Sequence, residues 1–189
     1  MSTTSAEERV AVVGLGYVGL PLATALARTF SVVGFDIDKD RIAELRAGKD
    51  RSGLVDAAAL GSPRLTFSPD PTVLRDATFI VVAVPTPVDP ANQPDLTPLR
   101  EASRTVGRNL SKDAVVVFES TVYPGCTEEL CVPLIEGESG LMVHRDWGIG
   151  YSPERIDPGD SDHELETVVK IISAGDDRTA ATGCADGLW

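Results

Sequence analysis

The feature that most constrains the fold is a glycine pattern near the start of the chain. In "RVAVVGLGYVG", an apolar run with strand character leads into Gly14, Gly16 and Gly19, which follow the spacing G-x-G-x-x-G. The stretch that follows, "YVGLPLATALART", has the pattern of an amphipathic helix. A strand, a glycine-rich turn and a helix in this order are typical of a phosphate-binding β-α-β unit. The first glycine allows the tight turn, the second lets backbone approach a pyrophosphate, and the third lets the helix pack on the sheet.

An acidic residue at the end of the next predicted strand complements this turn. Asp36 ends "VVGFD" and lies 22 positions after Gly14. Its carboxylate is expected to accept hydrogen bonds from the adenosine ribose and to repel the 2′-phosphate of NADP, so the pattern predicts NAD. FAD shares the fingerprint and stays an alternative. A second alternative is that the glycines only form a turn and that Asp36 only caps a helix.

Apolar and helix-compatible stretches alternate along the rest of the chain. This order predicts an α/β fold, a Rossmann-like doubly wound parallel sheet with helices on both faces. Strands are predicted at 31–38, 64–68, 77–85, 114–120 and 147–153, and helices at 38–48, 98–110 and 127–137. The NAD-binding domain is expected to span residues 8–176, with a weak helical signal at 163–172. Residues 177–189 lack clear periodicity and are predicted to be a tail of uncertain order.

Composition narrows the class of protein. With 189 residues, 42% of them hydrophobic, the chain suffices for one domain. A formal charge of −12, without a cluster of Lys and Arg, argues against a nucleic-acid partner. The apolar runs are too short to cross a bilayer, and the first residues lack the pattern of a secretory signal. The three cysteines and two histidines follow no metal-binding spacing. We therefore expect a cytoplasmic protein without a metal site or membrane association.

Polar residues follow three of the predicted strands at the points where the strands end. Ligands bind beyond the carboxyl ends of strands in an open parallel sheet, so we expect these sequences to converge on cofactor and substrate. They are "VPTPVDP" with Pro85 and Thr86, "ESTVYPG" with Ser120 and Thr121, and "YSPERIDPGD" with Glu154 and Arg155.

Two of these residues are candidates for chemistry. Thr121 either presents its hydroxyl to a ligand or caps the following helix, and the two roles are compatible. Glu154 either takes part in proton transfer, directly or through a water, or is a solvated loop carboxylate.

Five motifs together resemble a known family. "VVGLGYVGLPLA", "GFDIDKDRI", "VAVPTPVD", "ESTVYPGCTEE" and "GYSPERIDPGD" occur in this order and cover about residues 8–176. The chain resembles the nucleotide-sugar 6-dehydrogenases, the UDP-glucose/GDP-mannose dehydrogenase family. The sequences of these motifs are most similar to those of the bacterial branch that acts on UDP-N-acetylhexosamines and supplies uronic acids for surface polysaccharides.

The resemblance implies an NAD-dependent oxidation of the sugar C6 hydroxyl to a carboxylate in two steps. It implies catalytic roles for Thr121, which helps to hold a water, and for Glu154, which assists acid–base chemistry in thioester hydrolysis. The loop of Glu154, Arg155 and Ile156 is implied to contact the substrate. The implied cofactor contacts are Gly14, Gly16, Tyr17, Val18, Gly19, Asp36, Arg41, Pro85, Thr86, Ser120 and Thr121, with Asp36 and Arg41 flanking the adenosine ribose.

The chain also departs from the family, whose members are much longer. A helical middle domain, a nucleotide-sugar domain and a "GFGGSC"-like segment with the nucleophilic cysteine have no counterpart here, and Cys184 lacks that segment's neighbours. We therefore expect the chain to bind NAD, to be inactive alone, and to self-associate or to associate with the missing domains. The alternative is a non-catalytic dinucleotide-binding or interaction module. A short-chain or hydroxyacid dehydrogenase lacks support, because there is no Tyr-x-x-x-Lys motif and no paired catalytic histidine.

Overall fold

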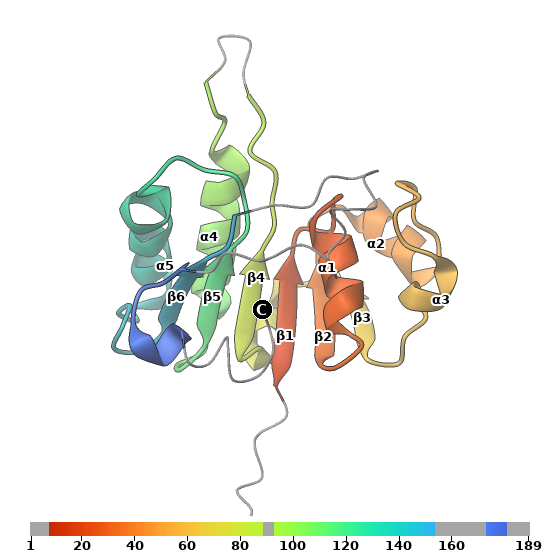
Figure 1. The fold of residues 1–189 in the computed structure, drawn as a ribbon, viewed down its shortest axis with the longest axis horizontal. Helices are drawn as coiled ribbons and strands as arrows, with labels where there is room; N and C mark the ends of the chain where they lie inside the picture. Colours follow the sequence, from red (N-terminus) through yellow and green to blue (C-terminus); the bar gives the residue numbers. More distant parts are fainter. Residues whose placement is uncertain (1–7, 89–92, 154–172, 181–189) are drawn as a thin grey trace, which may run out of the picture.

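A seven-stranded sheet forms the centre of the computed structural model, which describes residues 8–88, 93–153 and 173–180 (Figure 1). The strand order is β3-β2-β1-β4-β5-β6-β7, and all neighbours are parallel except β6 and β7. This order reverses direction between β1 and β4, which confirms the predicted doubly wound sheet. The strands are β1 (Arg9–Val13), β2 (Ser31–Phe35), β3 (Leu65–Ser68), β4 (Phe79–Val82), β5 (Val115–Phe118), β6 (Gly148–Tyr151) and β7 (Ser173–Ala174).

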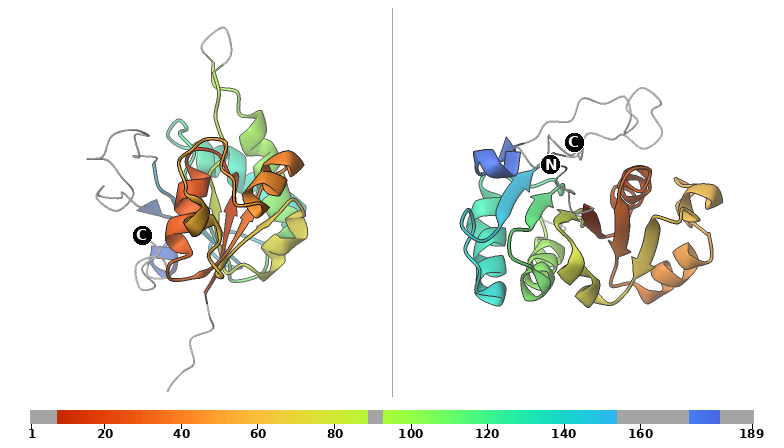
Figure 2. Two further views of the ribbon diagram at one scale, coloured as in Figure 1. Left: turned by 90° about the vertical axis from the view of Figure 1, so that its right-hand side faces the viewer. Right: turned by 90° about the horizontal axis from the view of Figure 1, so that it is seen from below.

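Helices cover both faces of the sheet (Figure 2). One core cluster joins the sheet to α1 (Gly19–Leu26), α2 (Lys39–Arg46) and α3 (Ala57–Leu60). The other joins it to the 3₁₀ helix η1 (Pro71–Asp76), to α4 (Thr97–Asn109), to the π-helix η2 (Thr127–Cys131) and to α5 (Val132–Ser139). Because both faces are covered, β4 and β5 are buried at every position, as their continuous apolar sequences predict.

Local signals place several helix ends. Asp38 caps α2, since its side chain accepts hydrogen bonds from the N–H groups of Asp40 and Arg41. Gly48 follows the end of α2 with a φ of 69°, a left-handed conformation that glycine adopts without strain. Residues 127–137 were predicted to be one helix despite Pro133. The chain instead makes the π-turns of η2 first, so that Pro133 lies in the first turn of α5, where no N–H is needed.

The structure also contains elements that periodicity did not predict. The short helices α3 and η1 connect β2 to β3 and β3 to β4. Residues 177–180 form a helical turn, and Thr179 is buried against β6, where a Cβ on Gly148 would collide with it. The weak helical signal at 163–172 lies outside the described residues. Within the described part of the chain, no helix is long and apolar enough to span a membrane.

Candidate functional site

The glycine-rich turn lies between β1 and α1, at the upper edge of the sheet in Figure 1. Gly14 has a φ of 92°, and a Cβ there would lie 2.8 Å from the carbonyl oxygen of Ala83. A Cβ on Gly19 would collide with the carbonyl oxygen of Gly14. A Cβ on Gly16 would meet nothing within 4 Å. The fold itself therefore requires Gly14 and Gly19, whereas Gly16 leaves an open surface that a ligand can approach.

The N-terminus of α1 is not capped by a side chain. Val18 occupies the cap position without a capping hydrogen bond, and the ladder begins with the Leu20 N–H donating to the Gly16 carbonyl at 3.2 Å. The first N–H groups of a helix carry the positive end of its dipole and suit a phosphate. The exposed Tyr17 lies beside this end of the helix.

Asp36 lies directly beyond β2, where the sequence predicts it. Its carboxylate accepts a hydrogen bond from the N–H of Leu15 at 2.8 Å and another from the N–H of Asp38 at 2.9 Å. Each carboxylate oxygen has a second lone pair, so Asp36 retains acceptor capacity for a ligand hydroxyl. The same residue thus orients the glycine turn and borders the site.

Arg41 is buried under the glycine turn, with 6% of its surface exposed. Its Nε donates to the carbonyl oxygen of Leu15 at 3.1 Å, and its Nη2 lies 2.8 Å from a carboxylate oxygen of Asp50. Its Nη1 is 3.9 Å from Glu44 and has no hydrogen-bond partner among the described residues. The peptide groups of Leu15 are therefore held from two sides, the N–H by Asp36 and the C=O by Arg41.

Asp50 fixes Arg41 in turn, and no sequence pattern pointed to it. Its carboxylate accepts from the N–H groups of Ser52, Leu54 and Val55 and from the Ser52 hydroxyl. Burial would raise the pKa of Asp50, but the hydrogen bonds from Ser52, Arg41 and Val55 outweigh it and hold this pKa well below its usual range. The carboxylate is therefore ionised at neutral pH and neutralises the buried guanidinium.

The loops that follow β4 and β5 are bound to each other. The Ser120 hydroxyl donates to the Val84 carbonyl at 2.6 Å, and the Thr86 hydroxyl donates to the Thr121 carbonyl at 2.8 Å. Ser120 is buried and Thr121 is exposed. These loops and the start of α1 enclose a pocket of about 130 Å³. Its lining residues are Gly16, Tyr17, Val18, Ala83, Val84, Pro85, Thr86, Glu119, Ser120 and Thr121.

The structure brings together most, but not all, of the predicted site. The glycine turn, Pro85-Thr86 and Ser120-Thr121 share the pocket, and Asp36 and Arg41 contact the turn through Leu15. Glu154, Arg155 and Ile156 lie outside the described residues.

Two further residues belong to this edge of the sheet and were missed. Glu119 is 3% exposed and lines the pocket. The sequence feature that could have indicated it is a carboxylate directly after a buried strand. Ile37 is 83% exposed beside Asp36. The sequence feature that could have indicated it is an apolar residue between two aspartates.

Two of the cysteines are unsuited to nucleophilic chemistry. Cys126 and Cys131 are fully buried. Burial raises the pKa of both thiols, that of Cys131 to about 12. A thiol in that state is not a nucleophile near neutral pH.

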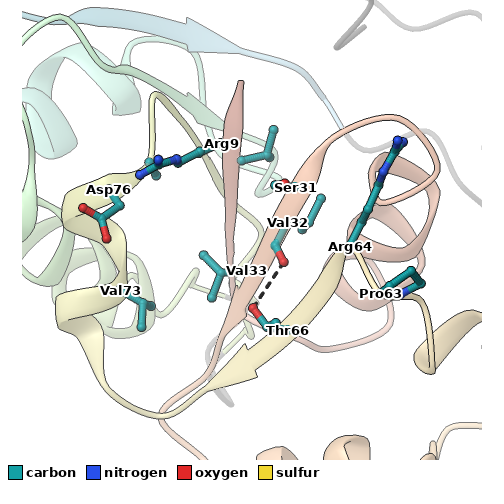
Figure 3. A pocket seen from close by; sticks show the side chains of 11 residues that line it. Arg9, Ser31, Val32, Val33, Pro63, Arg64, Thr66, Val73 and Asp76 are labelled. Carbon is teal, nitrogen blue, oxygen red and sulfur yellow. Dashed lines mark hydrogen bonds between the residues drawn. The ribbon is translucent and has the colours of Figure 1, made fainter. Parts of the chain in front are cut away.

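A larger hollow of about 350 Å³ lies at the opposite edge of the sheet, near the starts of β1 and β2 (Figure 3). Arg9, Ser31 and Arg64 line it, and the Thr66 hydroxyl donates to the Val32 carbonyl at 3.5 Å within it. It contains none of the predicted site residues. We favour the smaller pocket as the functional one, because open α/β sheets bind ligands at the carboxyl ends of their strands.

Comparison with known proteins agrees with this geometry. The model of the UDP-glucose/GDP-mannose dehydrogenase family, NAD binding domain, matches residues 8–185. The chain is 50% identical over 164 residues to protein CapL from Staphylococcus aureus, covering 87% of this chain and 39% of CapL. It is 52% identical over 166 residues to a UDP-N-acetyl-D-glucosamine 6-dehydrogenase from Pseudomonas aeruginosa, with the same two shares. The chain thus spans about two fifths of the length of these relatives.

Solved structures show the same fold. A UDP-D-ManNAc dehydrogenase from Pyrococcus horikoshii matches with a TM-score of 0.84 and 32% identity, over 95% of this chain and 44% of that one. A GDP-mannose dehydrogenase from Pseudomonas aeruginosa, solved as a ternary complex, matches with a TM-score of 0.84 and 28% identity, over 94% and 43%.

Proposed function

The chain belongs to the UDP-glucose/GDP-mannose dehydrogenase family, of which it forms the NAD-binding domain, and we propose that it serves the oxidation of a UDP-sugar C6 hydroxyl to a uronic acid. The sugar is a UDP-N-acetylhexosamine. This choice of substrate is supported by the names of two relatives. One is the Pseudomonas aeruginosa enzyme, and the other is a UDP-N-acetyl-D-glucosamine 6-dehydrogenase from Salmonella typhi, which is 48% identical.

One observation carries the proposal: the Asp36 carboxylate, the open turn at Gly16 and the polar pocket lie in line across the carboxyl ends of β2, β1, β4 and β5. Asp36 at the end of β2 would accept the adenosine ribose hydroxyls. The open backbone at Gly16 and the start of α1 would hold the pyrophosphate. The pocket between the ends of β4 and β5 is then left for the nicotinamide.

The residues of this pocket bind and orient rather than react. NAD, when bound, supplies the acceptor for the hydride that leaves C6. The hydroxyls of Ser120 and Thr86 donate hydrogen bonds to backbone carbonyls, so these two residues fix the two loops. Thr121 is exposed at the rim and is proposed to hold a water, and Glu154 is proposed to move protons, with Arg155 and Ile156 contacting the substrate.

The same proposal has consequences for the chain alone. We expect it to bind NAD without turnover, because the family's nucleophilic segment has no counterpart in this sequence. We further propose a cytoplasmic location, and association either between copies or with the remaining domains through apolar surface. A dinucleotide-binding or interaction module without catalysis is the competing proposal, and it predicts that replacing Thr121 leaves the biological role unchanged.

Calorimetric titration of the purified chain tests the proposal. We expect NAD to bind, NADP to bind more weakly, and a UDP-N-acetylhexosamine to bind weakly or not at all. In the Asp36→Asn variant, the preference for NAD over NADP should shrink, because a neutral amide no longer repels the 2′-phosphate. Absence of NAD binding in the folded chain would overturn the assignment, and steady formation of NADH would contradict its dependence on other domains.

A further inference from the structure

We propose that Arg51 is a latent contact for the 2′-phosphate of NADP, and that Asp38 and Glu44 keep it from acting as one. Asp36 would then favour NAD by repelling the phosphate, while the other two carboxylates favour NAD by occupying the nearby cation. The inference rests on the proposed function, because it needs the adenosine ribose to lie at Asp36.

A short series of contacts places Arg51 near Asp36. The N–H of Asp38 donates to a carboxylate oxygen of Asp36 at 2.9 Å. One carboxylate oxygen of Asp38 caps α2, and the other lies 3.5 Å from Nη2 of Arg51. The guanidinium therefore lies beside the start of α2, next to the carboxylate that would accept the ribose hydroxyls.

Two carboxylates hold Arg51 alongside α2. Its Nε donates to a carboxylate oxygen of Glu44 at 2.6 Å, and its Nη2 faces Asp38. A guanidinium binds phosphate through parallel N–H groups of this kind. The donors that a 2′-phosphate would need are therefore already engaged by side chains of the same helix.

Arg51 can exchange partners, whereas Arg41 cannot. The side chain of Arg41 is 8% exposed and is fixed to Leu15 and Asp50. The side chain of Arg51 is 51% exposed. Ion pairs between exposed side chains contribute little to stability, so one carboxylate partner can be replaced by another anion at low cost.

The surrounding charges explain why the wild-type chain should not use Arg51 for NADP. An entering 2′-phosphate would face the carboxylate of Asp36 and would also have to displace Asp38 or Glu44 from Arg51. Neutralising Asp36 removes the repulsion and leaves the competition in place. Removing the Glu44 carboxylate as well should free the guanidinium, and it leaves the cap at Asp38 intact.

Separate titrations with NADP and NAD test the inference in three variants of the chain. These are Asp36→Asn, Asp36→Asn with Glu44→Gln, and the same pair with Arg51→Gln added. The affinity for NADP relative to NAD should rise about two- to fivefold from the first variant to the second. It should fall back in the third. The gain should also shrink with added salt, because exposed charges are screened.

The ratio of the two affinities separates this effect from others. Glu44 also lies 3.9 Å from Arg41, and any change at Arg41 would alter the binding of both cofactors. Glu101→Gln in the Asp36→Asn chain frees another exposed arginine, Arg104 on α4, from its carboxylate partner. This control should leave the ratio unchanged.

Two results would overturn the inference and leave the proposed function intact. One is an equal ratio in the first two variants. The other is a gain that survives Arg51→Gln, because another cation, such as the exposed Lys39, would then bind the phosphate. Circular dichroism checks folding; if Asp36→Asn does not fold, Glu44→Gln in the wild-type chain should raise the ratio in the same direction. Absence of NAD binding by the wild-type chain would remove the proposed function and this inference together.

Discussion

Removing the carboxylate of Asp50 should both destabilise the fold and weaken cofactor binding. Its side chain is 1% exposed and pairs at 2.8 Å with the Arg41 guanidinium, whose side chain is 8% exposed. In Asp50→Ala, that guanidinium would keep its buried charge and lose its counter-ion. Loss of one partner of a buried ion pair costs about 3–5 kcal/mol. For a chain of this size, that loss corresponds to a fall in melting temperature of roughly 6–20 °C.

The cofactor effect follows from the second contact of Arg41. Its Nε holds the carbonyl oxygen of Leu15 inside the glycine turn. If the guanidinium reorients, the turn loses a hydrogen bond of about 1 kcal/mol, so NAD affinity should fall about fivefold. Urea denaturation measures the loss of stability. A separate titration with NAD, at a temperature where the variant remains folded, measures the loss of affinity.

A matched control separates burial from pairing alone. The exposed pair Arg108–Glu138 has a similar separation of 2.9 Å. Exposed pairs contribute about 0–1 kcal/mol, so Glu138→Ala should have little effect on stability and none on NAD affinity. If Asp50→Ala costs no more than Glu138→Ala, the reasoning about the buried pair is wrong.

The pH dependence of unfolding provides a second signature of the same residue. The pKa of Asp50 is lower in the folded chain than in the unfolded one, since hydrogen bonds favour its ionised form. Such a group contributes stability above its unfolded pKa of about 3.9, and this contribution is lost as the pH falls toward the folded value. Wild-type stability should therefore decrease more steeply below about pH 4 than that of Asp50→Asn.

Three further outcomes are expected. Gly19→Ala should prevent correct folding, because its Cβ would collide with the Gly14 carbonyl, whereas Gly16→Ala should fold and lose NAD affinity; circular dichroism and titration distinguish the two. Cys126 and Cys131 should resist thiol reagents in the native chain and react only after denaturation, and rapid native labelling of either one would contradict their burial. Ser120→Ala should cost about 1 kcal/mol by urea denaturation, since the Val84 carbonyl loses its donor.

Local patterns were sufficient for much of the fold. The glycine spacing, the apolar runs of β4 and β5 and the cap at Asp38 each act over a few neighbouring residues, so the sequence displays them directly. The doubly wound sheet also followed, because short connections and right-handed crossovers leave few arrangements for alternating strands and helices. The position of Asp36 at the mouth of the sheet was predictable for the same reason.

Contacts between distant segments were not predictable in this way. Arg41 occupies an early position in an amphipathic helix, and nothing nearby in the sequence indicates that it reaches back to Leu15, 26 residues earlier. The role of Asp50 depends on how the loop after α2 folds around its carboxylate, which a list of polar residues does not reveal. Glu119 was similarly hidden, because the burial of a strand-end carboxylate depends on what packs over it.

The contacts of Asp36 explain why cofactor preference and fold cannot be changed independently in this chain. Asp36, which would repel the 2′-phosphate of NADP, also accepts a hydrogen bond from the Leu15 N–H. The C=O of Leu15 is held by Arg41. A substitution of Asp36 that admits NADP therefore also alters one of the two supports of the glycine turn. Asparagine retains an oxygen acceptor for Leu15, whereas alanine does not. Asp36→Asn should therefore keep more of the dinucleotide affinity than Asp36→Ala, although both remove the same charge.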